Sequence, residues 1–124
     1  MTDIELVEMA AKAAGIKYDQ ESAKPHPKSD MWFGLWLLFD REPSEYDRRY
    51  WNPLADDGDA LRLAVKLGMV VYIDTHPEGR KCTEAKSETF AEGGIAIFNH
   101  GSDPYAATRR AIVLAAANIG KEAS

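Results

Sequence analysis

The sequence predicts an α+β fold in which helices pack on a small antiparallel sheet of three to four strands. The chain has 124 residues, of which 45% are hydrophobic and 28% charged, which suits one folded domain spanning residues 1–124. Capped helical patterns occur near both ends, and short β-branched segments separated by glycine and proline turns lie between them. The order of elements is helix, strand, helix, three strands and helix, which is typical of a sheet that carries helices on one or both faces.

The first helix is expected over residues 2–14. Thr2 and Glu5 have the S/T-x-x-E spacing of a capping box, and Gly15 supplies a stop signal. Apolar residues recur at steps of three and four along the segment, at Ile4, Val7, Ala11 and Ala14. We therefore expect one face of this helix to pack on the core.

The next part of the chain is predicted as a strand between two loops. Residues 20–30 are mostly polar, residues 40–53 are rich in charged residues, and each segment contains two prolines. Residues 31–39 form a bulky apolar strand that Gly34 bulges or breaks. Because both faces of this strand are apolar, both are expected to be covered, one of them by a sister subunit if the chain self-assembles.

The second helix follows the acidic run Asp56-Asp57-Gly58-Asp59 and extends to Leu67, where Gly68 ends it. Acidic side chains before a helix complement the positive end of its dipole. The buried face of this helix is predicted to contain Leu61, Ala64, Val65 and Leu67.

An antiparallel meander is expected after the second helix. Its strands cover residues 69–74, 80–87 and 94–99, and turns rich in glycine separate them. The first and third strands are apolar, whereas the middle strand is polar and has the weakest pattern.

The last helix covers residues 105–119. Ser102 or Asp103 caps it, Pro104 occupies its first position, and Gly120 is its expected stop. Because the helix is apolar almost all round, it is predicted to be deeply buried or to contact a second chain.

Charge and cysteine content limit the classes of function. The formal net charge is −5, which argues against a general nucleic-acid-binding surface. The single cysteine excludes an internal disulfide framework and a cysteine-based zinc finger. The N-terminus lacks the pattern of a signal peptide, and the longest apolar run is nine residues, against about 20 for a membrane helix. We therefore expect a cytoplasmic protein with no membrane partner.

Aromatic residues gather in one part of the chain. Seven of the twelve, including all three tryptophans, lie between residues 32 and 51. They either fill the core or form a binding surface, and Trp32, Trp36 and Tyr50 are the candidate interface residues.

An acidic segment overlaps this aromatic region. Residues 40–59 hold seven acidic residues against three arginines, which accounts for −4 of the net charge. Asp56, Asp57 and Asp59 could serve a metal-dependent enzyme, but their spacing does not match a calcium loop and helix capping is the simpler interpretation. No metal site is predicted.

Two arginines near the start of the last helix are candidate ligand residues. Arg109 and Arg110 could hold a phosphate near the helix N-terminus, with Trp51 stacking on the base of a nucleotide-like ligand. A solvated helix face or a surface ion pair is the alternative. No histidine spacing or nucleophile motif indicates a catalytic residue, and no cofactor is implied.

Two blocks of sequence resemble a known family. Trp51–Leu67, with its W-N-P and D-D-G-D-A elements, resembles a signature of small phage and prophage proteins, especially from pseudomonads. Asp103–Val113, continued by Ala115, Ala116, Ile119 and Gly120, is similar to their C-terminal helix. These proteins are grouped as phage ABA-sandwich domains and are distantly similar to NinX-type phage proteins. The resemblance implies a helix–sheet–helix sandwich and a phage or prophage origin. It implies no activity.

The leading functional hypothesis is a non-enzymatic phage accessory protein that binds a host protein or assembles with itself. The tryptophan-rich segment, the acidic patch beside it and the apolar last helix favour this hypothesis. In one version, the acidic patch mimics nucleic acid toward a basic host protein. The alternatives are a nucleotide-like ligand binder and a metal-dependent enzyme that uses the Asp56–Asp59 carboxylates.

Overall fold

The computed structural model describes residues 1–25, 31–45, 47, 49–75, 78–87 and 95–122. Its elements are α1 (Asp3–Ala14), the 3₁₀ turn η1 (Gln20–Ser22), β1 (Leu35–Trp36), β2 (Tyr50–Trp51), α2 (Asp57–Lys66), β3 (Met69–Asp74), β4 (Cys82–Ser87), β5 (Ile95–Asn99) and α3 (Pro104–Glu122). These elements confirm the predicted α+β class, in which helices pack on an antiparallel sheet.

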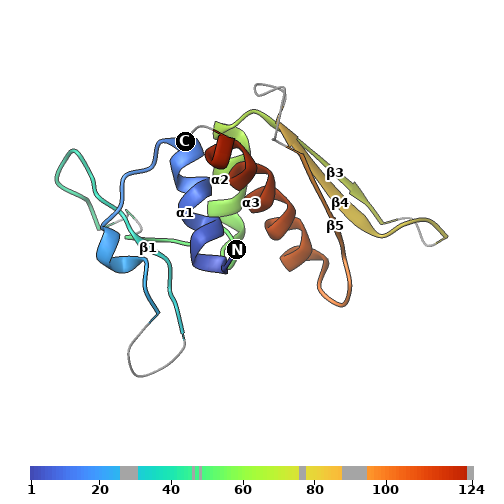
Figure 1. Ribbon diagram of the computed structural model, residues 1–124, viewed down its shortest axis with the longest axis horizontal. Coiled ribbons are helices and arrows are strands. Elements are labelled where there is room, and N and C mark those ends of the chain that lie inside the picture. Colours follow the sequence, from blue (N-terminus) through green and yellow to red (C-terminus); the bar gives the residue numbers. More distant parts are fainter. Residues whose placement is uncertain (26–30, 46, 48, 76–77, 88–94, 123–124) are drawn as a thin grey trace.

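The larger sheet is the predicted antiparallel meander, with strand order β3-β4-β5. Val71, Ala85 and Ala96 are cross-strand partners on the face that packs against the helices. Figure 1 shows the helices on one side of this sheet, with α3 between α1 and the strands. The polar middle strand, β4, is therefore present as predicted and lies at the centre of the sheet.

Helix α3 is the centre of the core. Nine of its residues are buried, because α1 packs on one side of the helix and β4 and β5 pack on the other. Its apolar character thus follows from contacts within the same chain. The predicted stop at Gly120 is wrong, since α3 continues to Glu122. A Cβ atom at Gly120 would collide with the backbone carbonyl of Met9, so this glycine lets α3 and α1 approach closely.

Helix α1 has the predicted caps. The Thr2 hydroxyl oxygen accepts a hydrogen bond from Glu5 N at 3.2 Å, and Gly15 ends the helix with a φ of +68°. A positive φ disfavours any residue with a side chain, so glycine suits this position.

Helix α2 begins as predicted but buries a different face. Asp56 is its N-cap and accepts a hydrogen bond from Asp59 N at 2.8 Å. Leu61 and Val65, which were expected to be buried, are 64% and 72% exposed. Ala64 and Leu67 are buried as predicted, and Ala60 and Leu63 complete the buried stripe. These positions, separated by steps of three and four, lie on one narrow helix face, the face that packs against α3 and β3.

The predicted strand over residues 31–39 is much shorter than expected. Only Leu35–Trp36 is a strand, and it pairs with β2 in a separate two-stranded sheet. Gly34 precedes it with a φ of +133°, and a Cβ atom there would lie 2.6 Å from the carbonyl oxygen of Trp51. The predicted strand is thus broken at Gly34, as expected, and β1 begins only after it. Its partner β2 lies within a segment that was predicted to be a loop.

None of the described helices combines the length and the apolar character that a membrane span requires.

Candidate functional site

The outer side of the small sheet carries a cluster of aromatic rings and one guanidinium. Trp36 and Tyr50 are cross-strand partners, and their rings meet edge to face with centroids 5.0 Å apart. The Phe33 ring lies 6.1 Å from the Tyr50 ring, and the Arg49 guanidinium lies 4.7 Å from the centre of the Trp36 ring. We call Phe33, Trp36, Arg49 and Tyr50 the aromatic cluster. Both contact types stabilise a fixed arrangement of the side chains.

In the small sheet, one cross-strand pair faces the core and the other faces the surface. Leu35 and Trp51, the other cross-strand pair, are buried in the core. Phe33 and Tyr50 are 59% and 43% exposed on the outside. The aromatic segment therefore divides between the two roles that the sequence left open, with Trp51 in the core and the aromatic cluster at the surface.

A hollow of about 300 Å³ lies beside the aromatic cluster. All three predicted interface residues, Trp32, Trp36 and Tyr50, line it. The indole N–H of Trp32 donates to the carbonyl oxygen of Ser22 at 2.8 Å, which attaches this part of the chain to η1. The carboxylates of Asp19 and Glu21 contribute to the same lining. Lys24, which pairs with Glu21 at 3.0 Å, lines the hollow as well, so its walls combine apolar side chains with charges of both signs.

An ion pair organises the loop that leads from β1 toward β2. The Arg41 guanidinium donates to both carboxylate oxygens of Asp47, at 2.7 and 3.0 Å, and Ser44 N donates to Asp47 at 2.8 Å. The hydrogen bond from Arg41, followed by that from Ser44 N, holds the pKa of Asp47 well below its usual range. Arg41 also lies 5.5 Å from the centre of the Phe39 ring. These contacts hold the loop beside the aromatic cluster.

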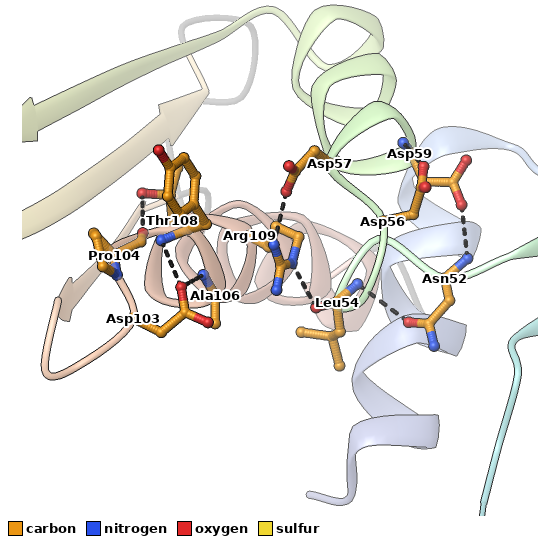
Figure 2. Close-up of polar contacts among 11 residues, drawn as sticks. Asn52, Leu54, Asp56, Asp57, Asp59, Asp103, Pro104, Ala106, Thr108 and Arg109 are labelled. Atoms are coloured by element: carbon orange, nitrogen blue, oxygen red, sulfur yellow. Dashed lines mark hydrogen bonds and ion pairs between the residues drawn. The ribbon is translucent and has the colours of Figure 1, made fainter.

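The residues predicted to bind a nucleotide-like ligand do not surround one pocket. Figure 2 shows Arg109 reaching from α3 to the start of α2, where its Nε donates to Leu54 O at 2.8 Å and its guanidinium pairs with Asp57 at 2.7 Å. Arg110 pairs instead with Asp3 of α1 at 3.1 Å. The Trp51 ring is buried in the core. The three side chains therefore point to different parts of the molecule.

The N-terminus of α3 already has a side-chain cap. The Asp103 carboxylate accepts hydrogen bonds from Tyr105 N and Ala106 N, both at 3.1 Å. It occupies the position where the sequence hypothesis placed a phosphate.

The W-N-P and D-D-G-D elements form one structural unit at the start of α2 (Figure 2). Asn52 N donates to the Asp59 carboxylate at 3.0 Å, and the Asn52 side-chain oxygen accepts from Leu54 N at 3.2 Å. Asp59 is almost fully buried and also pairs with Arg62 at 2.8 Å. These contacts shape the chain between β2 and α2, so the two elements act together as turn and cap.

Within the described residues, no group of three or more histidine, cysteine, aspartate or glutamate side chains lies close enough to hold a metal ion. His26 and His76 lie outside those residues. His100 is buried, and its Nε2 atom lies 2.8 Å from the Thr83 hydroxyl oxygen.

A second feature, which sequence reasoning missed, is an apolar groove between α2, β3 and α3. Its volume is about 470 Å³. Leu61, Val71, Ile73, Tyr105 and Ile112 form its walls, and the Arg109–Asp57 pair lies at its margin. The sequence predicts Leu61 in the core, because a leucine has the same apolar character in the core and in the wall of a groove. The signal that could have revealed the groove is a surplus of apolar residues on α2, more than one narrow helix face can bury.

The chain matches no model of a known protein family, and comparison with curated proteins and with solved structures gives no match. The resemblance to phage proteins therefore stays a prediction.

Proposed function

We propose that the protein is a non-enzymatic phage or prophage accessory protein that binds a basic host protein through the aromatic cluster. The observation that carries this proposal is an ordered set of aromatic rings and a guanidinium at the surface. Tryptophan, tyrosine and arginine dominate the residues that contribute most to protein–protein binding. Leu35 and Trp51 supply the apolar contacts that the small sheet makes with the core, so the outer rings are free to serve a partner.

Charge indicates the chemistry of the partner. Asp40, Glu42 and Glu45 are exposed directly after the aromatic segment, and of these three Asp40 pairs with Lys17. Asp19, Glu21 and Lys24 line the hollow beside the rings, so two carboxylates face one ammonium there. A basic surface with one protruding apolar side chain complements this arrangement, because the side chain fills the hollow and cations face the carboxylates.

Site-specific photo-crosslinking in pseudomonad cells tests the proposal. We expect p-benzoylphenylalanine at position 50, in place of Tyr50, to cross-link to one basic host protein. Trp36→Ala in the same chain should reduce the yield at least tenfold, because the binding surface loses the ring that packs against position 50. Binding of the purified pair should also weaken as salt concentration rises, since charge contributes to it.

Tyr105 provides the matched control, because it is an exposed tyrosine on α3, outside the aromatic cluster. The same photo-reactive group at position 105 should not capture that protein. The proposal fails if both positions give the same products, or if Trp36→Ala folds normally and leaves the cross-link unchanged.

The apolar groove supports a second candidate function, the binding of a small apolar molecule. Its volume of about 470 Å³ lies in the range of small-molecule pockets. Its walls are aliphatic and aromatic, and its one arginine is engaged by Asp57 and by Leu54 O. An acyl chain suits these walls better than a nucleotide, whose phosphates need unengaged donors.

A thermal shift series with fatty acids of increasing chain length tests this candidate. We expect a rise in melting temperature that Leu61→Glu abolishes, because Leu61 lines the groove. Val65→Glu is the control, since Val65 is also largely exposed on α2 but does not line the groove. A response that is absent at every chain length, or equal in the two variants, would exclude the groove as the site.

A further inference from the structure

The face of the β3–β5 sheet that points away from the helices carries apolar side chains along both edge strands. We call Val70, Tyr72, Glu84, Lys86, Ile95 and Ile97 the outer sheet face. The four apolar members are 47–66% exposed. In Figure 1 the helices lie on the other side of the sheet, and no described element covers this one. A solvent-facing side of an antiparallel sheet normally carries polar residues, so this pattern needs an explanation.

These residues form two rows across the three strands. Val70, Lys86 and Ile95 are successive cross-strand partners in one row. Tyr72, Glu84 and Ile97 are partners in the next row along the strands. Each row therefore reads apolar, charged, apolar, and the charge is positive in one row and negative in the other.

This pattern is complementary to itself under one particular two-fold rotation. Two copies are placed with their outer sheet faces opposed. The two-fold axis lies midway between these faces, is perpendicular to the strands, and passes between the two rows. The rotation places each row over the other row of a second copy, so Lys86 faces Glu84 and Val70 faces Tyr72 across the interface. An axis along β4 would instead oppose like charges. Two-fold dimers require such a self-matching surface.

We propose that a second copy of this chain docks on the outer sheet face, with the two β4 strands antiparallel and with Glu84 and Lys86 of each copy paired across the axis. The apolar side chains of the edge strands pack in two stripes on either side of these pairs, as in a face-to-face packing of sheets. The ion pairs set the register, because a shift by one row opposes like charges.

The size of the face sets the expected strength of the dimer. Three strands about 4.8 Å apart, each contributing two residues to the outer sheet face, make a small patch. Specific interfaces below about 1,200 Å² are typically weak or transient. We therefore expect assembly that depends on concentration. This inference is independent of the proposed function, because the aromatic cluster lies on the other sheet, and either can fail without the other.

Charge reversal with complementation tests the dimer. In sedimentation velocity from 5 to 500 µM, the wild-type chain should shift from 13.8 kDa toward twice that mass. Glu84→Lys and Lys86→Glu should each weaken assembly at least tenfold, since each variant opposes like charges. An equimolar mixture of the two variants should restore assembly, because every charge then meets its opposite. The chain with both substitutions should also assemble.

Two further variants test whether the dimer uses this surface and not another one. Ile97→Asn should weaken the dimer without a change of charge, whereas Leu61→Glu, on the apolar groove, should not affect it. Circular dichroism and thermal unfolding establish that each variant is folded. A wild-type chain that stays monomeric up to 500 µM would overturn the proposal, as would folded single variants that assemble normally or a mixture that does not regain assembly.

Discussion

At the scale of single residues, two glycines mark close contacts between segments that are distant in the sequence. A helix that reaches a glycine near its C-terminus commonly stops there, which is why residue 120 was expected to end the last helix. Gly120 instead lies inside α3, against the carbonyl of Met9. Gly34 is similarly close to the carbonyl of Trp51. Both glycines are required by a neighbour that is distant in the sequence, and no local pattern contains that neighbour.

The ion pair between Arg41 and Asp47 makes the stability of the loop depend on pH. The pKa of Asp47 is lower in the folded chain than the ordinary aspartate value of about 3.9. Its contribution to stability is therefore fully present above that value and is lost as the pH falls from there through the folded-state pKa. Asp47→Asn should lower the melting temperature at pH 7, and this difference from wild type should shrink as the pH falls below about 4.

Thermal unfolding of both proteins between pH 2 and pH 7 provides the measurement. Glu45→Gln is a suitable control, because Glu45 is an exposed carboxylate in the same loop. Its effect should be small at every pH. A difference between Asp47→Asn and wild type that stays constant down to pH 2 would contradict the role assigned to this pair.

At the scale of elements, Arg109 joins α3 to the start of α2. It is mostly buried, whereas its partner Asp57 is mostly exposed. Arg109→Ala should therefore destabilise the fold by about 1–3 kcal/mol, because the Leu54 carbonyl loses its donor. Asp57→Ala should cost less than about 1 kcal/mol, as is usual for an exposed partner. The double variant should be close to Arg109→Ala alone.

Urea unfolding of the three variants completes a double-mutant cycle. Lys121→Ala is the control, because it removes an exposed charge near the other end of the same helix. If Arg109→Ala is as stable as wild type, Arg109 does not join the two helices. It would then again be a candidate ligand-binding residue.

The W-N-P and D-D-G-D elements together fix the start of α2. Asp56 caps α2 while Asp59, three residues later, turns back to hold Asn52 N. Capping could be predicted, because it depends on residues within one helical turn. The return contact to Asn52 could not, because it depends on the path of the chain before the helix.

At the scale of the whole molecule, the sheet of β3–β5 and the small sheet of β1–β2 lie at opposite ends, with the helices between them (Figure 1). The aromatic cluster belongs to the small sheet, and the outer sheet face belongs to the larger one. A partner at one end therefore does not obstruct a second copy at the other, which allows the two proposed contacts to coexist in one assembly.

For the predicted site residues, too, composition predicts part of the outcome and contacts between distant segments decide the rest. Trp32, Trp36 and Tyr50 were predicted together from composition, and all three line one hollow. Trp51 has the same chemistry as Trp36 but is buried, because adjacent residues of a strand face opposite sides and Trp51 follows Tyr50. Composition identified the segment, and the pairing of β1 with β2 assigned each ring to the core or to the surface.

The sequence by itself determined the α+β class, the meander over β3 to β5, and the caps of α1 and α2, because these depend on neighbouring residues and on periodicities of two or 3.6. Only the tertiary structure decided that α3 is enclosed by its own chain, that Leu61 and Val65 face outward, and that the helices share one side of the sheet. Burial depends on which distant elements meet, and an apolar side chain has the same chemistry on a covered face and on one that awaits a partner.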